Sequence, residues 1–187
     1  MKTYILPSLK LTAVVLILCA VLYPLLIAGV AKAAPGGGDG VTVSVNGKVV
    51  GYANIGQKFT EDKYFWGRPS AVDYNAAGSA GSNKAPSNPD YLKTVQDRID
   101  SFMVHNPDVK KSDIPTEMVT ASGSGLDPDV SPAGALVQVK RIAKARNLSE
   151  EKIKQLVAEH TQKPLLGFLG PQKVNVLKLN VALDLLK

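Results

Sequence analysis

The sequence contains few of the residues that carry most enzymatic and metal chemistry. Its 187 residues include one cysteine, Cys19, and two histidines, His105 and His160. A single cysteine excludes an intrachain disulfide, and the lack of a His-Glu-x-x-His motif argues against a zinc site. Neither a Gly-x-x-x-x-Gly-Lys-Ser/Thr phosphate loop nor an Asp-Lys-Thr-Gly phosphorylation motif occurs. We therefore expect no catalytic residue, no metal site and no cofactor site in this chain.

A block of charge of one sign is also missing. The formal net charge is +6, but without lysines 2, 10 and 32 the chain holds 19 basic and 16 acidic residues. These charges are interspersed, which argues against nucleic acid as a partner.

Charge is absent altogether from Leu11–Val30, a run of mostly apolar residues with Lys10 before it and Lys32 after it. Twenty residues in a helix span about 30 Å, the thickness of a bilayer hydrocarbon core. We expect a short cytoplasmic N-terminus over residues 1–10 and a transmembrane helix over residues 11–31 in contact with membrane lipid.

The alternative is a cleaved secretory signal, because Ala31-Lys32-Ala33 resembles a cleavage site. The apolar run is longer than the 7–15 residues or so of a signal h-region, which favours an uncleaved anchor. Two lysines and the amino terminus precede the span, so the positive-inside rule predicts a cytoplasmic N-terminus. The rest of the chain would then be extracytoplasmic.

Residues 32–40 are glycine-rich and predict a flexible tether, and residues 41–187 are long enough for one domain. Alternating β-branched residues around Asn46-Gly47 predict a β-hairpin. Residues 53–89 are rich in Gly, Ser, Asn and Pro and predict a long ordered loop, held to the domain by Tyr64-Phe65-Trp66.

Helix signals follow this loop. Asn88-Pro89 begins one helix that ends at Asn106-Pro107, and Ser131-Pro132 begins a second, with Gln138, Arg141, Lys144 and Arg146 expected on a solvated face. Ser149 caps a third, and residues 174–181 alternate as a strand before a helical pattern. The fold class is α+β, a single transmembrane helix followed by one extracytoplasmic domain.

Ser122-Gly123-Ser124-Gly125 fails the Gly-x-Ser-x-Gly pattern at both serines and predicts a tight turn with a glycine at positive φ. Its N–H groups would bond Asp127 or water, and Arg68 would bridge loop carbonyls or a carboxylate. A membrane-anchored extracytoplasmic serine hydrolase or cell-wall-binding module, using Ser122 or Ser124, remains the alternative function.

Three segments are unusual. The first is Tyr64-Phe65-Trp66-Gly67-Arg68-Pro69-Ser70-Ala71, and the second is residues 119–128, which include the Ser122–Gly125 turn and lead into Ser131-Pro132. The third is Leu166-Gly167-Phe168-Leu169-Gly170-Pro171, followed by Val174-Asn175-Val176-Leu177. In this order, behind one N-terminal apolar helix, the chain resembles the C subunits of bacterial Kdp-type potassium-transporting ATPases.

This resemblance implies an accessory subunit of an ATP-driven potassium importer in the bacterial inner membrane, needed for assembly and activity. Its partners would be a channel-like subunit, a P-type ATPase subunit and a small one-helix subunit. The complex would use ATP, Mg²⁺ and potassium, none of them bound by this chain.

The resemblance also implies a catalytic chaperone that raises the ATP affinity of the ATPase subunit, through a Ser-Gly-Gly-Ser-Asn segment. Here that segment reads Ser79-Ala80-Gly81-Ser82-Asn83. An extracytoplasmic domain has no access to cytoplasmic ATP, so the predicted topology argues against direct contact.

The candidates for partner contact come from three places. They are the small residues Ala20, Ala28 and Gly29 of the span, which would pack against the channel-like subunit, and the motif residues Gly67, Arg68, Pro69, Ser122, Gly123, Ser124, Gly125 and Asp127. Gln138 and Arg141 join them because the helix from Pro132 to Arg146 could, as the alternative to a solvated face, dock on the channel-like subunit.

Overall fold

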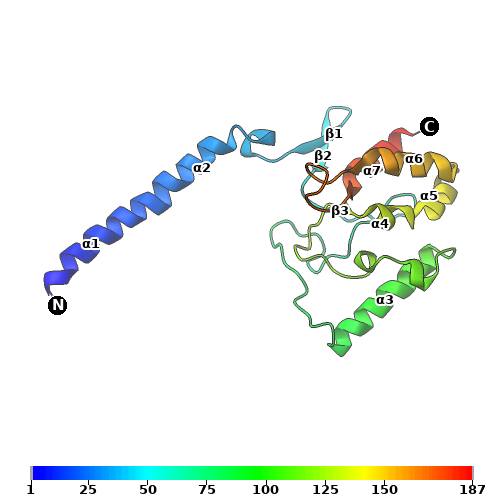
Figure 1. Cartoon of the computed structure of the whole chain (residues 1–187), viewed down its shortest axis with the longest axis horizontal. Helices are drawn as coiled ribbons and strands as arrows, with labels where there is room; N and C mark the ends of the chain where they lie inside the picture. The colour runs from blue at the N-terminus through cyan, green and yellow to red at the C-terminus, as the bar shows by residue number, and fades with distance from the viewer. Residues whose placement is uncertain (1, 187) are drawn as a thin grey trace. The chain divides into compact units, whose positions relative to one another are not determined.

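A computed structural model describes residues 2–186, and the chain divides into two compact units at the boundary between Val41 and Thr42. The first unit is helical and the second combines helices with two small sheets (Figure 1). The predicted fold class, one apolar helix followed by an α+β domain, is confirmed.

The first unit contains a continuous apolar helix over Thr3–Ala31, long and apolar enough to cross a membrane. It comprises α1 (Lys2–Ile17), a π-helical turn η1 (Leu18–Leu22) and α2 (Tyr23–Ala31). Pro24, the second residue of α2, lies two positions after the last residue of the π-helical turn, and because proline has no N–H it cannot donate to the preceding turn. A short 3₁₀ segment, η2 (Pro35–Gly38), follows.

The second unit begins with an antiparallel hairpin of β1 (Thr42–Val45) and β2 (Lys48–Tyr52). Asn46 and Gly47 between them both have positive φ, as a type I′ turn requires, so the predicted hairpin is confirmed. Residues 53–88 then contain neither helix nor strand, as predicted for this segment.

The helix α3 (Pro89–His105) begins as predicted, with the Asn88 side chain accepting a hydrogen bond from the Tyr91 N–H. Only Phe102 of its described residues is buried, and Leu92 is exposed, so α3 contributes little to the core. Two 3₁₀ turns, η3 (Lys111–Asp113) and η4 (Thr116–Met118), lead to the strand β3 (Asp129–Val130).

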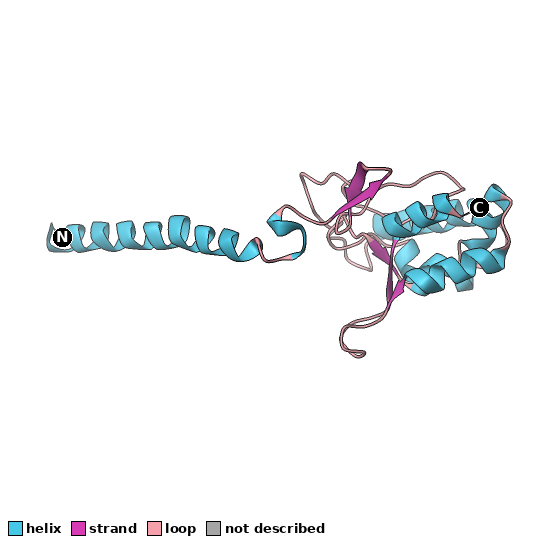
Figure 2. Cartoon of the chain, turned by 90° about the horizontal axis from the view of Figure 1, so that it is seen from above, coloured by secondary structure: helices cyan, strands magenta, loops and turns pink. Residues whose placement is uncertain are grey.

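The core lies among α5 (Val139–Arg146), α6 (Glu150–His160) and α7 (Val176–Leu185), which pack together in Figure 2. They bury Ile142, Ile153, Leu179 and Leu183 against the antiparallel sheet β3-β5-β4, where β4 is Thr161–Gln162 and β5 is Lys173–Asn175. The predicted Ser149 cap is confirmed, since its hydroxyl accepts from the Lys152 N–H.

Two sequence predictions in this region are wrong in detail. The second helix is divided into α4 (Pro132–Leu136) and α5, with Val137 and Gln138 between them. The strand predicted over residues 174–181 ends at Asn175, because the Asn175 side chain accepts from the Lys178 N–H and so caps α7. A local capping bond therefore overrides the alternation of apolar residues.

Two buried side-chain amides hold the long loop to the core. Asn180 accepts from the Phe65 N–H at 2.8 Å and donates to the Phe65 carbonyl at 2.9 Å. Gln138 does the same for Trp66, at 2.8 and 3.1 Å. A primary amide carries the same donor and acceptor pair as a peptide group, so these side chains serve residues 65–66 as an adjacent strand would.

Because Asn180 satisfies both backbone groups of a buried residue, we expect Asn180→Ala to lower the free energy of unfolding by about 3–5 kcal/mol. The substitution leaves the Phe65 N–H and carbonyl without partners inside the core. Urea unfolding followed by fluorescence of Trp66, the only tryptophan, measures the loss.

Gln155→Ala is the matched control, because this amide lies on the exposed side of α6 and bonds only Glu159. We expect it to change the free energy of unfolding by less than about 0.5 kcal/mol. Equal losses in the two variants would contradict the role assigned to Asn180.

Candidate functional site

The structure brings together two of the motifs singled out in the sequence. Ser122 donates its N–H to the Pro69 carbonyl at 3.0 Å, and the Ser70 hydroxyl donates to the Gly125 carbonyl at 2.7 Å. We call residues 67–74, 79–83 and 122–127 the loop cluster. Its members lie far apart in sequence but form one surface feature of the domain.

An ion pair closes the loop cluster. Arg68 Nη1 lies 3.0 Å from Asp127 Oδ2, with both side chains only about a quarter exposed. The prediction that Arg68 binds a carboxylate is confirmed, and partial burial makes such a pair stronger than one at the surface. Asp127 uses its other oxygen to accept from the Asp129 N–H.

The predicted turn over Ser122–Gly125 is also confirmed, with Gly125 at a φ of +67°. A Cβ at Gly125 would lie 2.6 Å from a Val72 methyl group and 2.7 Å from the Ala80 carbonyl oxygen. Of the two partners expected for the N–H groups of this turn, Asp127 or water, Asp127 instead accepts from the Asp129 N–H, while Ser124 Oγ accepts from the Leu126 N–H.

The segment Ser79-Ala80-Gly81-Ser82-Asn83 packs on this turn. The Ser79 hydroxyl donates to the Ser124 carbonyl at 2.8 Å. Gly81 lies so close to Gly123 that a Cβ there would meet the Gly123 oxygen at 2.9 Å. Both small residues are thus used in contacts within the domain.

Tyr74 completes the loop cluster by donating its hydroxyl to the Arg68 carbonyl. Burial, and then the charge of Asp127, raise the pKa of Tyr74 to about 12. The phenol therefore remains a neutral donor across the physiological pH range and holds the backbone of Arg68 in place.

The two serines have no partner for nucleophilic chemistry. Ser122 is buried, and the Ser124 hydroxyl accepts from a backbone N–H. His105 pairs with Asp62 at 2.8 Å and His160 bonds the Leu156 carbonyl, so the structure pairs neither histidine with a serine. Among residues 2–186 there is also no group of three His, Cys, Asp or Glu side chains arranged to hold a metal ion.

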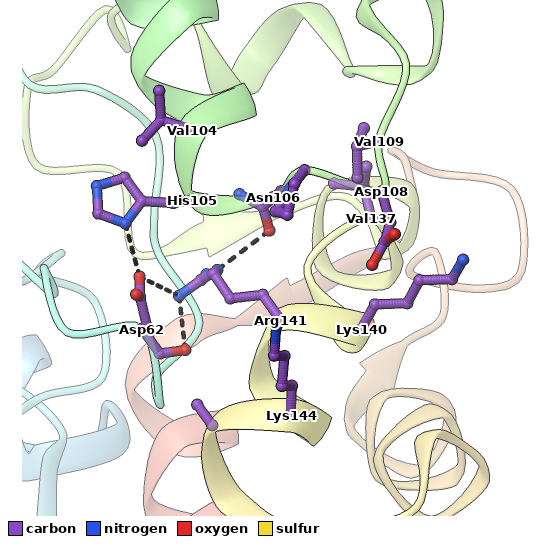
Figure 3. A pocket seen from close by; sticks show the side chains of 12 residues that line it. Asp62, Val104, His105, Asn106, Asp108, Val109, Val137, Lys140, Arg141 and Lys144 are labelled. Atoms are coloured by element: carbon purple, nitrogen blue, oxygen red, sulfur yellow. Dashed lines mark hydrogen bonds and ion pairs between the residues drawn. The ribbon is translucent and has the colours of Figure 1, made fainter.

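A second polar cluster surrounds Arg141 beside a cavity of about 600 Å³ (Figure 3). The guanidinium donates to the Asp62 carbonyl at 2.7 Å, to Asn106 Oδ1 at 3.1 Å and to Gln138 Oε1 at 2.7 Å. It also stacks on the Trp66 ring, 4.2 Å from the ring centroid. The predicted solvated face is therefore wrong for Gln138 and Arg141, which are both buried.

Burial lowers the pKa of Arg141 to about 10, against an opposing effect of the Asp62 carboxylate. The group still carries its charge at neutral pH, and its donors are occupied by this chain. Lys140 and Lys144 line the cavity with exposed positive charges, and Asp62 and Asp108 line it with negative charges. Mixed charge of this kind gives neither a carboxylate cage for potassium nor a basic patch for phosphate.

The span residues Ala20, Ala28 and Gly29 lie in η1 and α2 and are exposed. A Cβ at Gly29 would meet no atom within 4 Å. Their role in packing against other membrane helices stays a prediction, as does partner contact for the loop cluster residues.

Sequence reasoning missed Asn180 and Asn106 as organising residues, and it predicted that Trp66 holds the loop to the domain but not that Arg141 stacks on its ring. A usable signal exists for Asn180, since a polar amide among Leu177, Leu179 and Leu183 has to find a partner in the core. The sequence of Asn106-Pro107 indicates only a helix end, but the Asn106 amide also donates to the Phe102 carbonyl and accepts from Arg141.

Fold and site together define a class of protein with one N-terminal helix that could span a membrane and an α+β domain whose polar clusters bond the domain itself. The family model of the K⁺-transporting ATPase c chain, KdpC, matches residues 5–185. The chain therefore belongs to this family, in agreement with the resemblance seen in its motifs, and is a subunit of a K⁺-transporting ATPase complex.

Individual relatives agree. A Flavobacterium johnsoniae protein named potassium-transporting ATPase KdpC subunit is 66% identical over 179 residues, 96% of each chain. One of the same name from Bacteroides fragilis is 53% identical over 190 residues, 100% of this chain and 99% of its own. A third, from Caldanaerobacter subterraneus subsp. tengcongensis, is 46% identical over 177 residues, 94% and 92% of the two chains.

For the loop cluster, we expect Gly125→Ala to lower the free energy of unfolding by about 2–4 kcal/mol, because it adds a Cβ to a positive-φ residue in close contact. Gly123→Ala, two residues away, meets nothing within 4 Å and should be within about 0.5 kcal/mol of the parent. Urea midpoints compare the two, and a neutral Gly125→Ala would contradict the packing described.

Proposed function

We propose that this chain is a non-catalytic accessory subunit that supports the assembly and activity of an ATP-driven potassium import complex. Its partners would be a channel-like subunit, a P-type ATPase subunit and a small one-helix subunit. The observation that carries the proposal is that, in a member of this family, the polar clusters around Arg68 and Arg141 bond side chains and backbone groups of the domain itself. A domain organised in this way serves as a rigid body for contact.

The helix supplies the anchor in this proposal. Its apolar stretch from Leu11 to Val30 would lie in the inner membrane with the N-terminus in the cytoplasm and the domain outside. The small residues Ala20, Ala28 and Gly29 offer close approach to neighbouring helices.

An effect of this subunit on ATP affinity would then be indirect. With the domain outside the membrane, contact with nucleotide is excluded by topology, and Ser79 and Gly81 already pack on the Ser122–Gly125 turn. Such an effect would pass through the membrane helix or through the partner subunits. The serine hydrolase alternative finds no support in the geometry of Ser122 and Ser124.

The test is purification of the whole complex from its native membrane through a tag on this chain. We expect a P-type ATPase subunit and a channel-like subunit to copurify with potassium-stimulated ATP hydrolysis, and the activity to fall when this chain is removed. Replacing Leu11–Val30 by an unrelated span of equal length separates a role of the helix from a role of the domain. Recovery of an isolated chain, or activity unaffected by its removal, would overturn the proposal.

Orientation has its own test, which uses the single cysteine of the chain. With Cys19→Ala as the background, Ser112→Cys places a thiol at an exposed position of the domain. We expect a membrane-impermeant maleimide to label it at the extracytoplasmic side of the inner membrane, in spheroplasts. Labelling that requires membrane lysis would place the domain in the cytoplasm.

A further inference from the structure

The connection between β4 and β5 is an apolar projection, which we call the finger and define as Pro164–Pro171. Leu165, Leu166 and Phe168 are 70%, 75% and 74% exposed, and Leu169 is 49% exposed. No charged residue occurs between Lys163 and Lys173. Four large apolar side chains within five residues are thus exposed to solvent together.

The backbone of the finger has a fixed conformation. Leu165 and Leu169 exchange both backbone hydrogen bonds, at 3.0 and 2.9 Å, and the Gly167 N–H donates to the Pro164 carbonyl at 2.9 Å. Leu166, Gly167 and Gly170 have positive φ. Positive φ is strained for leucine, so the conformation of Leu166 costs free energy that the surrounding structure has to offset.

A hollow of about 330 Å³ adjoins the base of the finger. Residues on both sides of the finger in sequence line the hollow, together with residues of α4 and α6. They are Thr161, Lys163 and Gln172, then Pro132 and Leu136 of α4, and Lys154, Val157 and Ala158 of α6. Leu136 is itself 45% exposed. A projecting loop beside a hollow is an uneven surface. Such a surface can be matched by a folded protein of complementary shape, as is typical of protein interfaces.

A lipid surface fits the same features less well. The finger has no Trp or Tyr, the residues enriched at membrane interfaces, and of its two flanking lysines Lys173 is paired with Asp129 at 2.7 Å. Irregular backbone is also not found exposed to hydrocarbon, whereas a protein recess can satisfy its free polar groups.

We propose that the finger inserts into an apolar recess of a neighbouring subunit of the same K⁺-transporting complex. This inference rests on the proposed function, because it names the element through which the domain contacts its partner. A preordered tip loses little conformational entropy on docking, and Phe168 is the aromatic anchor of the contact.

The test places a photoreactive benzoylphenylalanine at position 168 of the full chain within the assembled complex. Irradiation is expected to join this chain to another subunit, identified by mass spectrometry. Benzoylphenylalanine at Leu92, which is 54% exposed on α3, is the matched control and is expected to give no such product. Crosslinks to lipid alone, or no product above that control, would overturn the proposal.

Phe168→Asp gives a second readout. We expect it to reduce retention of the other subunits in mild detergent about tenfold or more, whereas Leu92→Asp changes it less than twofold. The urea midpoint of Phe168→Asp should match that of the parent, because the side chain makes no core contact. Full retention would reject the finger contact alone, since the proposed function is tested by removal of the whole chain.

Discussion

The domain depends on the pairing of two side-chain amides with consecutive backbone positions. Asn180 and Gln138 each donate to and accept from one residue, Phe65 and Trp66, in the interior. A buried loop without partners would be unstable, because each unsatisfied peptide group costs about 1–3 kcal/mol. With these bonds formed, a segment of irregular structure becomes part of the core and positions Arg68 beside Asp127.

Polar and apolar residues thus have opposite roles in this chain. Arg141, Gln138 and Asn106 are arginine and amide side chains of the kind that often mark binding sites, but their bonds all end on the domain itself. The finger contains only apolar side chains and glycine or proline, and has no partner side chains in the domain core. The finger is therefore an exposed apolar surface, while Arg141, Gln138 and Asn106 bond one another and the backbone of residue 62 inside the domain.

Local signals predicted the parts of the fold that local interactions decide. The Asn46-Gly47 turn, the Asn88 and Ser149 caps and the positive φ at Gly125 each depend on a few neighbouring residues. The burial of Gln138 and Arg141 was not predictable in this way. It depends on residues 61–66, which lie 72 or more positions away in the chain, so spacing along the helix indicated a solvated face.

The separation in sequence between the loop and its anchors sets the order in which the domain folds. Phe65 bonds a residue 115 positions later, and Trp66 one 72 positions later. Contacts between residues so far apart in the sequence form slowly, and only after the later segment has been synthesised. During synthesis the loop therefore has to wait, undocked, until α7 has left the ribosome, and loss of the last helix would release a segment near the beginning of the domain.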